Sequence, residues 1–134
     1  MTNYLLDTNI VSDLVRNPQG PIAAHLCKVG ESRIATSIIV ASELRCGADK
    51  KGSPRLTHQL ESVLGVLQVL PFESPADEFY GRIRAELEAL GKPIGSNDLL
   101  IAAHALSLGH TLVTDNTREF SRVRSLKVEN WLRA

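Results

Sequence analysis

Short apolar runs alternate along the chain with longer stretches in which apolar residues recur every three or four positions. The short runs are typical of buried parallel strands, and the longer stretches are typical of helices with one buried face. Strands are predicted at residues 3–6, 33–36, 69–72, 111–114 and 126–128, and helices at residues 10–16, 22–29, 38–46, 56–67, 75–90, 99–108 and, as a single turn, 118–121. This order favours one α/β sandwich over residues 1–134, with a mainly parallel sheet flanked by helices.

Glycine, proline and small polar residues mark the expected ends of these elements. Gly47 is expected to end the helix 38–46, and the basic, polar segment 49–55 is the clearest predicted loop. Pro71 has no backbone N–H to donate to a neighbouring strand, so the strand 69–72 is predicted at an edge of the sheet. The expected helix N-caps are Thr8 or Asn9, Ser37, and Ser96 or Asn97.

The composition is that of an ordinary globular protein. Apolar residues make up 43% of the 134 residues and charged residues 22%, which is enough for a self-standing core. The 15 basic and 15 acidic residues cancel, so overall charge gives no indication of a nucleic acid partner. The local distribution of charge still decides what a cleft attracts.

The cysteines and the apolar runs indicate where the protein works. Cys27 and Cys46 are far apart and flank no histidine pair at zinc-binding intervals, so both are expected to be reduced thiols in the core. No apolar run has the length of a membrane-spanning helix, and residues 1–3 begin no basic and apolar leader. These features predict a cytoplasmic protein without a membrane segment.

Four acidic residues lie where the predicted elements bring them to one edge of the sheet. Asp7 ends the first strand and Asp115 ends the fourth, while Glu43 lies on a helix and Asp98 opens another. In an open parallel sheet, ligands bind beyond the carboxyl ends of the strands. The sequence therefore predicts that these four acids meet in one crevice.

Clustered carboxylates have a specific chemical use. They repel one another, and burial raises their pKa values, so such a cluster is stable when cations neutralise it. Mg²⁺ and Mn²⁺ prefer oxygen ligands, and the absence of His and Cys from these motifs argues against zinc, copper or iron. One or two such ions can activate a water and stabilise the charge on a phosphate. The residues thus favour hydrolysis of a phosphodiester bond.

Each acid also has a simpler interpretation when it is taken alone. Asp7 is placed to start a turn or cap a helix, and Asp98 is favoured by the helix dipole in a first turn. Glu43 could be paired with a basic neighbour such as Arg45 or Arg82. His25, His58, His104 and His110 are scattered and are expected to be structural. Only the combination of the four acids favours a metal site.

Four motifs carry a resemblance to a known family over nearly the full length. They are residues 5–9 (Leu-Leu-Asp-Thr-Asn), residues 41–44 (Ala-Ser-Glu-Leu) followed by Gly47, residues 94–103 (Ile-Gly-Ser-Asn-Asp-Leu-Leu-Ile-Ala-Ala), and residues 112–116 (Leu-Val-Thr-Asp-Asn) with Phe120. In this order and spacing, the chain resembles the PIN-domain ribonucleases, and within them the VapC-type toxins of bacterial toxin–antitoxin pairs.

This resemblance implies a PIN-like three-layer sandwich and a metal-dependent endoribonuclease. Asp7, Glu43 and Asp98 would be the catalytic acids that hold Mg²⁺ or Mn²⁺, with polar support from Thr8 or Ser12.

The fourth position of the implied site has two candidates. The family pattern places Asn116 at the matching position, and Asp115 lies one residue before it, after the supporting Thr114. Neighbouring side chains on a strand point to opposite faces, so only one of the two can face the metal unless the chain has already turned. Asp115 and Asn116 remain alternatives at this stage.

The resemblance also implies partners, namely an RNA substrate, a second copy of the chain in a homodimer, and a cognate antitoxin whose tail covers the acidic site. Two basic groups are candidates for contacts with RNA phosphates. The first is Arg45, Lys50 and Lys51 with Arg55, and the second is Arg118, Arg122 and Arg124.

Other function classes fit the same acids less well. A non-catalytic module with this fold would use them to grip a basic peptide. A structure-specific DNA nuclease shares the acid cluster, but this chain has little room for the additional arch or clamp that such enzymes carry. A receiver-type phosphoacceptor domain ranks lower, because no Asp follows an apolar strand in the middle of the chain.

Overall fold

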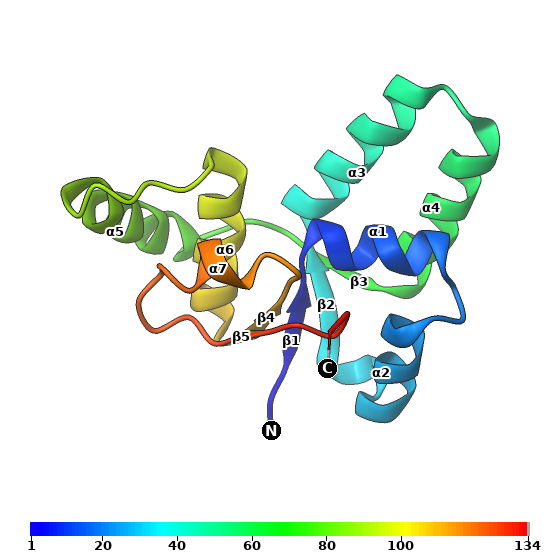
Figure 1. The fold of residues 1–134 in the computed structure, drawn as a ribbon, viewed down its shortest axis with the longest axis horizontal. Coiled ribbons are helices and arrows are strands. Elements are labelled where there is room, and N and C mark those ends of the chain that lie inside the picture. The colour runs from blue at the N-terminus through cyan, green and yellow to red at the C-terminus, as the bar shows by residue number, and fades with distance from the viewer. Residues whose placement is uncertain (134) are drawn as a thin grey trace.

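The computed structural model describes residues 1–133 and contains one parallel sheet of five strands (Figure 1). The strands are β1 (Tyr4–Leu6), β2 (Ile34–Ser37), β3 (Gln68–Leu70), β4 (Thr111–Val113) and β5 (Val128–Glu129). The helices are α1 (Thr8–Arg16), α2 (Pro21–Val29), the 3₁₀ turn η1 (Glu31–Arg33), α3 (Ile38–Lys51), α4 (Pro54–Val66), α5 (Ala76–Ala89), α6 (Ser96–Leu108) and α7 (Thr117–Phe120). The predicted α/β class and parallel sheet are confirmed.

The sheet order is β3-β2-β1-β4-β5, so β1 lies at its centre. The chain adds strands on one side of β1 first and on the other side afterwards, which makes β1 the point where the strand order reverses. Leu6 pairs with Thr36 on one side and with Val113 on the other. The carboxyl ends of β1, β2 and β4 therefore meet at one edge, where parallel sheets bind ligands.

Helices cover both faces of the sheet, with α1 to α4 on one side and α5 and α6 on the other (Figure 1). Leu5, Leu6, Leu112 and Val113 are completely buried between these layers. This explains why the strands read as short apolar runs and not as alternating ones. Trp131 packs the C-terminal segment down by stacking on His25, at 4.8 Å between ring centroids.

The prediction for the region around Gly47 is wrong. Helix α3 continues through Gly47 to Lys51, and Gly52, with φ of +61°, ends it. Pro54 then opens α4, so most of the predicted loop 49–55 is helical. A glycine inside a helix costs only about 1 kcal/mol relative to alanine, whereas the left-handed conformation at a helix end strongly favours glycine.

Two helix caps also differ from the prediction. Asp7 itself is the N-cap of α1, and its carboxylate accepts a hydrogen bond from the Thr8 backbone N–H. Gly95 occupies the N-cap position of α6. Ser37 caps α3 as expected, through the backbone N–H of Ile39 at 3.0 Å.

The prediction that both cysteines are core residues is also wrong. Cys27 and Cys46 are free and exposed. Among residues 1–133, no helix is long and apolar enough to span a membrane.

Candidate metal centre

Asp7 lies at the carboxyl end of β1 with its side chain only 3% exposed. Its Oδ1 accepts a hydrogen bond from the Thr8 backbone N–H at 2.7 Å, and its Oδ2 accepts one from Thr114 Oγ1 at 2.7 Å. Burial raises the pKa of Asp7, the two hydrogen bonds oppose this rise, and the Glu43 and Glu119 carboxylates add to it. Asp7 is therefore a buried acid held in place from β4.

Glu43 is held from two other helices. Its Oε1 accepts a hydrogen bond from Thr8 Oγ1 of α1 at 2.6 Å, and its Oε2 accepts one from Asn97 Nδ2 of α6 at 3.3 Å. The predicted support from Thr8 thus reaches Glu43 through the side chain. Asn97 was expected to act only as a cap, and the structure adds this second contact. Ser12 makes no such bond and lines a small groove beside Glu43.

Asp98 shows most directly that the acids are crowded. Its pKa is raised to about 7, first by burial and then by the negative charges of Asp7, Glu119 and Glu43. A carboxyl group with ordinary surroundings has a pKa near 4. The sequence prediction that Asp7, Glu43 and Asp98 lie in one crevice therefore agrees with the electrostatics of the structure.

Glu119 on α7 is a site residue that the sequence analysis missed. Its Oε1 accepts a hydrogen bond from the Gly95 backbone N–H at 3.2 Å, and its Oε2 accepts one from Asn116 Nδ2 at 2.8 Å. The hydrogen bond from Asn116 is the main cause of its lowered pKa, and Asp98 also hydrogen-bonds to it. The available signal was the spacing, because an acid three residues after Asn at a helix start often interacts with that end of the helix.

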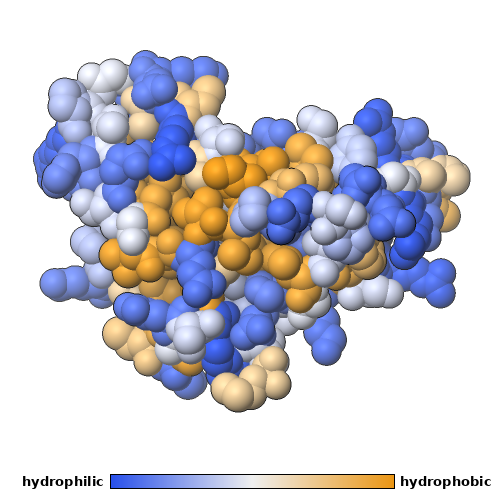
Figure 2. Space-filling model, turned by 180° about the vertical axis from the view of Figure 1, so that it is seen from behind, coloured by the Kyte–Doolittle hydropathy of each residue, from blue (hydrophilic) through white to orange (hydrophobic). Residues whose placement is uncertain are grey.

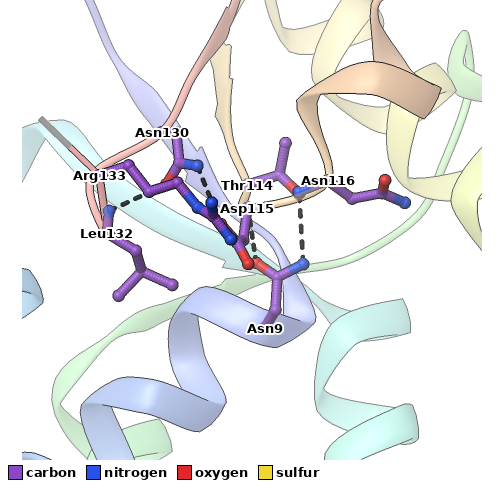
Figure 3. Close-up of polar contacts among 7 residues, drawn as sticks. All are labelled: Asn9, Thr114, Asp115, Asn116, Asn130, Leu132 and Arg133. Carbon is purple, nitrogen blue, oxygen red and sulfur yellow. Dashed lines mark hydrogen bonds and ion pairs between the residues drawn. The ribbon is translucent and has the colours of Figure 1, made fainter.

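Asp115 points away from the other acids. Its Oδ1 accepts hydrogen bonds from Asn130 Nδ2 at 2.9 Å and from Arg133 Nε at 3.0 Å, and these bonds lower its pKa (Figure 3). The other candidate for the fourth position, Asn116, contacts Glu119. The structure therefore brings neither predicted alternative into direct contact with Asp7. Thr114 makes that contact, and Glu119 acts on Asp7 through its negative charge.

Asn9 connects the two strand ends. Its Oδ1 accepts a hydrogen bond from the Asp115 backbone N–H at 2.9 Å, and its Nδ2 donates to Thr114 Oγ1 at 3.3 Å (Figure 3). The same Nδ2 lies 3.4 Å from Asp7 Oδ2. Asn9 therefore orients both the acid of β1 and the hydroxyl that supports it.

The predicted phosphate-binding residues are placed differently from one another. Arg45 is engaged in a two-pronged ion pair with Glu61 of α4, at 2.9 Å for each nitrogen–oxygen distance. Lys50 and Lys51 are exposed in the last turn of α3. Arg122 donates a hydrogen bond to the Pro93 carbonyl at 3.2 Å. Of the three candidates on α3, only Lys51 lines the groove beside Glu43.

The donor chemistry of this site fits a hard divalent cation. The converging groups are carboxylates, supported by hydroxyl and amide groups, and this is the ligand set that Mg²⁺ and Mn²⁺ prefer. Among residues 1–133, no three His, Cys, Asp or Glu side chains form a ready-made coordination set. The donor types nevertheless suit such a cation, and its positive charge would lower the raised pKa of Asp98 again.

Known proteins resemble this chain over its whole length. Ribonuclease VapC2 from Haemophilus influenzae is 41% identical over 133 residues, which cover 98% of this chain and 100% of the relative. The tRNA(fMet)-specific endonuclease VapC from Shigella flexneri is 36% identical over 132 residues, covering 98% and 99%. VapBC2 from Rickettsia felis, solved bound to a promoter DNA fragment, superposes with a TM-score of 0.88 at 36% identity, covering 97% of this chain and 99% of that one.

The family model for the PIN domain matches residues 4–126, which span every site residue described above. The match, the sequence identities and the structural superposition agree with one another. The chain therefore belongs to the PIN domain family and, within it, to the VapC ribonucleases.

Proposed function

We propose that this protein is a Mg²⁺- or Mn²⁺-dependent endoribonuclease in which Asp7, Glu43 and Asp98 hold the ion and Glu119 is the fourth acid. The observation that carries the proposal is the arrangement of the acids. Thr8 donates hydrogen bonds to both Asp7 and Glu43, and the charges of Asp7, Glu119 and Glu43 add to burial in raising the pKa of Asp98. Its relatives are named ribonucleases, which supports RNA as the substrate. A location in the cytoplasm, where RNA is found, is part of the same proposal.

A bound cation would supply the positive charge that activates water and stabilises charge on the phosphate. The residues of the chain prepare that site. Thr114 and the Thr8 backbone N–H orient Asp7, and Thr8 with Asn97 orients Glu43. Asp98 has a pKa of about 7 in the metal-free protein, and it would release its proton when the cation binds.

A cleavage assay tests this function. Purified protein is incubated with a panel of RNAs, with Mn²⁺ or with EDTA, and compared with Asp98→Asn and with the exposed control Asp49→Asn. The panel includes initiator tRNA because the Shigella flexneri relative is named for tRNA(fMet). Wild type and Asp49→Asn are expected to cut in Mn²⁺, while Asp98→Asn is expected to be inactive. Equal cutting by all three proteins would overturn the metal site.

The same assay separates the two alternative functions. Preferential cutting of structured DNA would favour a DNA nuclease. An absence of cutting, combined with binding of a basic peptide that Asp98→Asn abolishes, would favour a non-catalytic binding module.

An antitoxin partner is a second part of the proposal. The Rickettsia felis structure is that of VapBC2, and the resemblance to VapC-type toxins implies a cognate antitoxin. An apolar pocket of about 390 Å³ lies between α1, α2 and α4, with a lining that includes Leu14, Leu26, Val63 and Leu67. Figure 2 shows apolar side chains gathered at the middle of the face opposite to that of Figure 1. Such exposed apolar surface favours protein partners.

Copurification and light scattering test both partners. The protein encoded by the adjacent reading frame is expected to copurify with this chain and to suppress RNA cleavage. The isolated chain is expected to have the mass of a dimer. A monomer mass at micromolar concentration would contradict the homodimer.

A further inference from the structure

A narrow groove of about 170 Å³ leads away from Glu43 between α1, α3 and α4. In Figure 1, α1 and α3 leave the same edge of the sheet and diverge, while α4 runs beside them. Leu56 and Leu60 of α4 form part of the groove lining. The groove is thus continuous with the acidic site at one end.

Two sets of residues with helical spacing follow this groove, and all of their members except Thr8 line it. On α1, Thr8, Ser12 and Arg16 are four residues apart, and on α3 the matching set is Glu43, Gly47 and Lys51. Residues four apart lie on one face of a helix. The first residues of the two sets, Thr8 and Glu43, are hydrogen-bonded to each other. The last residues, Arg16 and Lys51, both line the groove and carry a positive charge. Eight residues of helix place Lys51 about 12 Å from Glu43 along the α3 axis.

The two cations at the far end are available to a ligand. Arg16 and Lys51 are exposed, and neither forms an ion pair within residues 1–133. A cation in the last turn of a helix also complements the helix dipole. An interaction with the helix dipole does not explain why Arg16 and Lys51, which end two different helices, line the same groove.

Gly47 provides an independent observation. It lies in the interior of α3, where glycine is less stable than alanine by about 1 kcal/mol. A Cβ atom at this position would meet nothing within 4 Å, so the fold does not require glycine there. The missing side chain instead leaves the groove open between Glu43 and Lys51.

We infer that this groove binds the RNA strand, and that Arg16 and Lys51 hold a phosphate a few nucleotides from the cleaved bond. The inference rests on the proposed ribonuclease function and assigns a binding role to residues outside the acidic cluster. A chain with a phosphate at every nucleotide suits a groove with a cation-holding site at one end and two fixed cations at the other. Arg and Lys are the residues that proteins use most for such contacts.

Steady-state cleavage of a short RNA in Mn²⁺ tests the inference, with Arg16→Gln/Lys51→Gln compared with wild type. The control is Lys28→Gln, an equally exposed lysine in the last turn of α2 that does not line the groove. The double variant is expected to raise KM about two- to five-fold per lost cation while kcat and Mn²⁺ affinity stay unchanged. The slope of log affinity against log salt should fall by about 0.7 for each lost cation.

Gly47→Gln gives a second test that separates binding from folding. It fills the groove with a residue that favours helices, so KM is expected to rise while the Tm stays the same or increases. An unchanged KM and salt slope in both variants would overturn the inference. Unchanged RNA affinity with weaker binding of the protein from the adjacent reading frame would assign the groove to that partner and would also overturn it.

Failure of the proposed function can be told apart from failure of this inference. The fluorescence anisotropy of a labelled RNA measures binding in Ca²⁺ whether or not the wild type cuts. If the wild type cuts RNA and the double variant matches Lys28→Gln, the function stands and the groove assignment fails. If the wild type neither cuts nor binds RNA, the function and the inference built on it fail together.

Discussion

The ends of β1 and β4 look alike in sequence, but their acidic residues make different contacts in the structure. One reads Leu-Asp-Thr-Asn from residue 6, and the other reads Val-Thr-Asp-Asn from residue 113. The sheet register pairs Leu6 with Val113, so the residue that matches Asp7 is Thr114 and not Asp115. Asp7 turns inward as an acid, and Thr114 turns inward as the hydroxyl that holds it.

The remaining acid of the β4 end supports the C-terminal segment. Asp115 accepts hydrogen bonds from Asn130 and Arg133, and its backbone N–H donates to Asn9. The comparison of the two strand ends shows that an acid after a buried strand is not by itself a site residue. Its register relative to the neighbouring strand decides which way it faces.

The largest expected difference in RNA cleavage is between Asp7→Asn and Asp115→Asn, in which the acid at each strand end is exchanged for its amide. Asp7→Asn should lower RNA cleavage at least about 100-fold, since losing even an outer partner of a metal ligand costs 10- to 100-fold. Asp115→Asn should cleave at close to the wild-type rate, because its carboxylate faces Arg133. Rates measured side by side in Mn²⁺ test this, and equal losses in the two variants would refute the proposed division of roles.

Removing the hydroxyl of β4 should have the next largest effect. Thr114→Val keeps the shape of the side chain but removes one of the two hydrogen bonds at 2.7 Å that the buried Asp7 carboxylate accepts. Cleavage should fall about 10- to 100-fold, and stability should fall by about 1–3 kcal/mol. Thr114→Ser should restore most of both. A Val variant as active as the wild type would show that Asp7 does not depend on β4.

The raised pKa of Asp98 predicts how the metal-free protein responds to pH. Its folded pKa of about 7 exceeds its unfolded value of 3.8, so its contribution to stability is complete below pH 3.8 and is lost as pH rises through 7. Asp98→Asn cannot lose this contribution. In thermal melts with EDTA, the Tm of Asp98→Asn should therefore rise relative to the Tm of the wild type between pH 4 and pH 8. Parallel Tm curves would contradict the crowding of the acids.

Removing the ion pair between Arg133 and Asp115, which holds the C-terminal segment beside the end of β4, should give the smallest effect. Arg133→Gln removes an exposed partner of Asp115, and exposed ion pairs contribute little to stability. A slightly lower Tm at neutral pH, with unchanged cleavage, is expected. Because the hydrogen bonds lower the pKa of Asp115, any Tm difference should shrink as pH falls and the carboxylate is protonated. Loss of cleavage in Arg133→Gln would show that the catalytic site depends on the Arg133–Asp115 ion pair.

The fold was predictable because the three inner strands, β1, β2 and β4, are buried and therefore read as short apolar runs. The positions of the three acids were predictable for a related reason. Asp7 directly follows such a run, Glu43 lies on the helix that follows one, and Asp98 lies on the helix that precedes one. Gly47 misled the prediction of α3, because local propensity cannot show that a glycine is tolerated within a helix packed on its neighbours.

The spacing of Glu119 from Asn116 predicts only a contact at the start of a helix, because its place beside the other acids depends on contacts distant in sequence. Glu119 joins the site only when α7 folds back onto Gly95, which is 24 residues away along the chain. The choice between Asp115 and Asn116 stayed open for a similar reason, since the Asp115 partners Asn130 and Arg133 come from the C-terminal segment.

A calorimetric titration with Mn²⁺ at pH 7.5 tests the central claim most directly, with wild type, Glu119→Gln and Asp115→Asn measured in the same buffer. If the site consists of Asp7, Glu43, Asp98 and Glu119, then Glu119→Gln should bind Mn²⁺ at least about 10-fold more weakly, and Asp115→Asn should bind it as tightly as the wild type. Weaker binding by Asp115→Asn, with wild-type binding by Glu119→Gln, would contradict this account of the two strand ends.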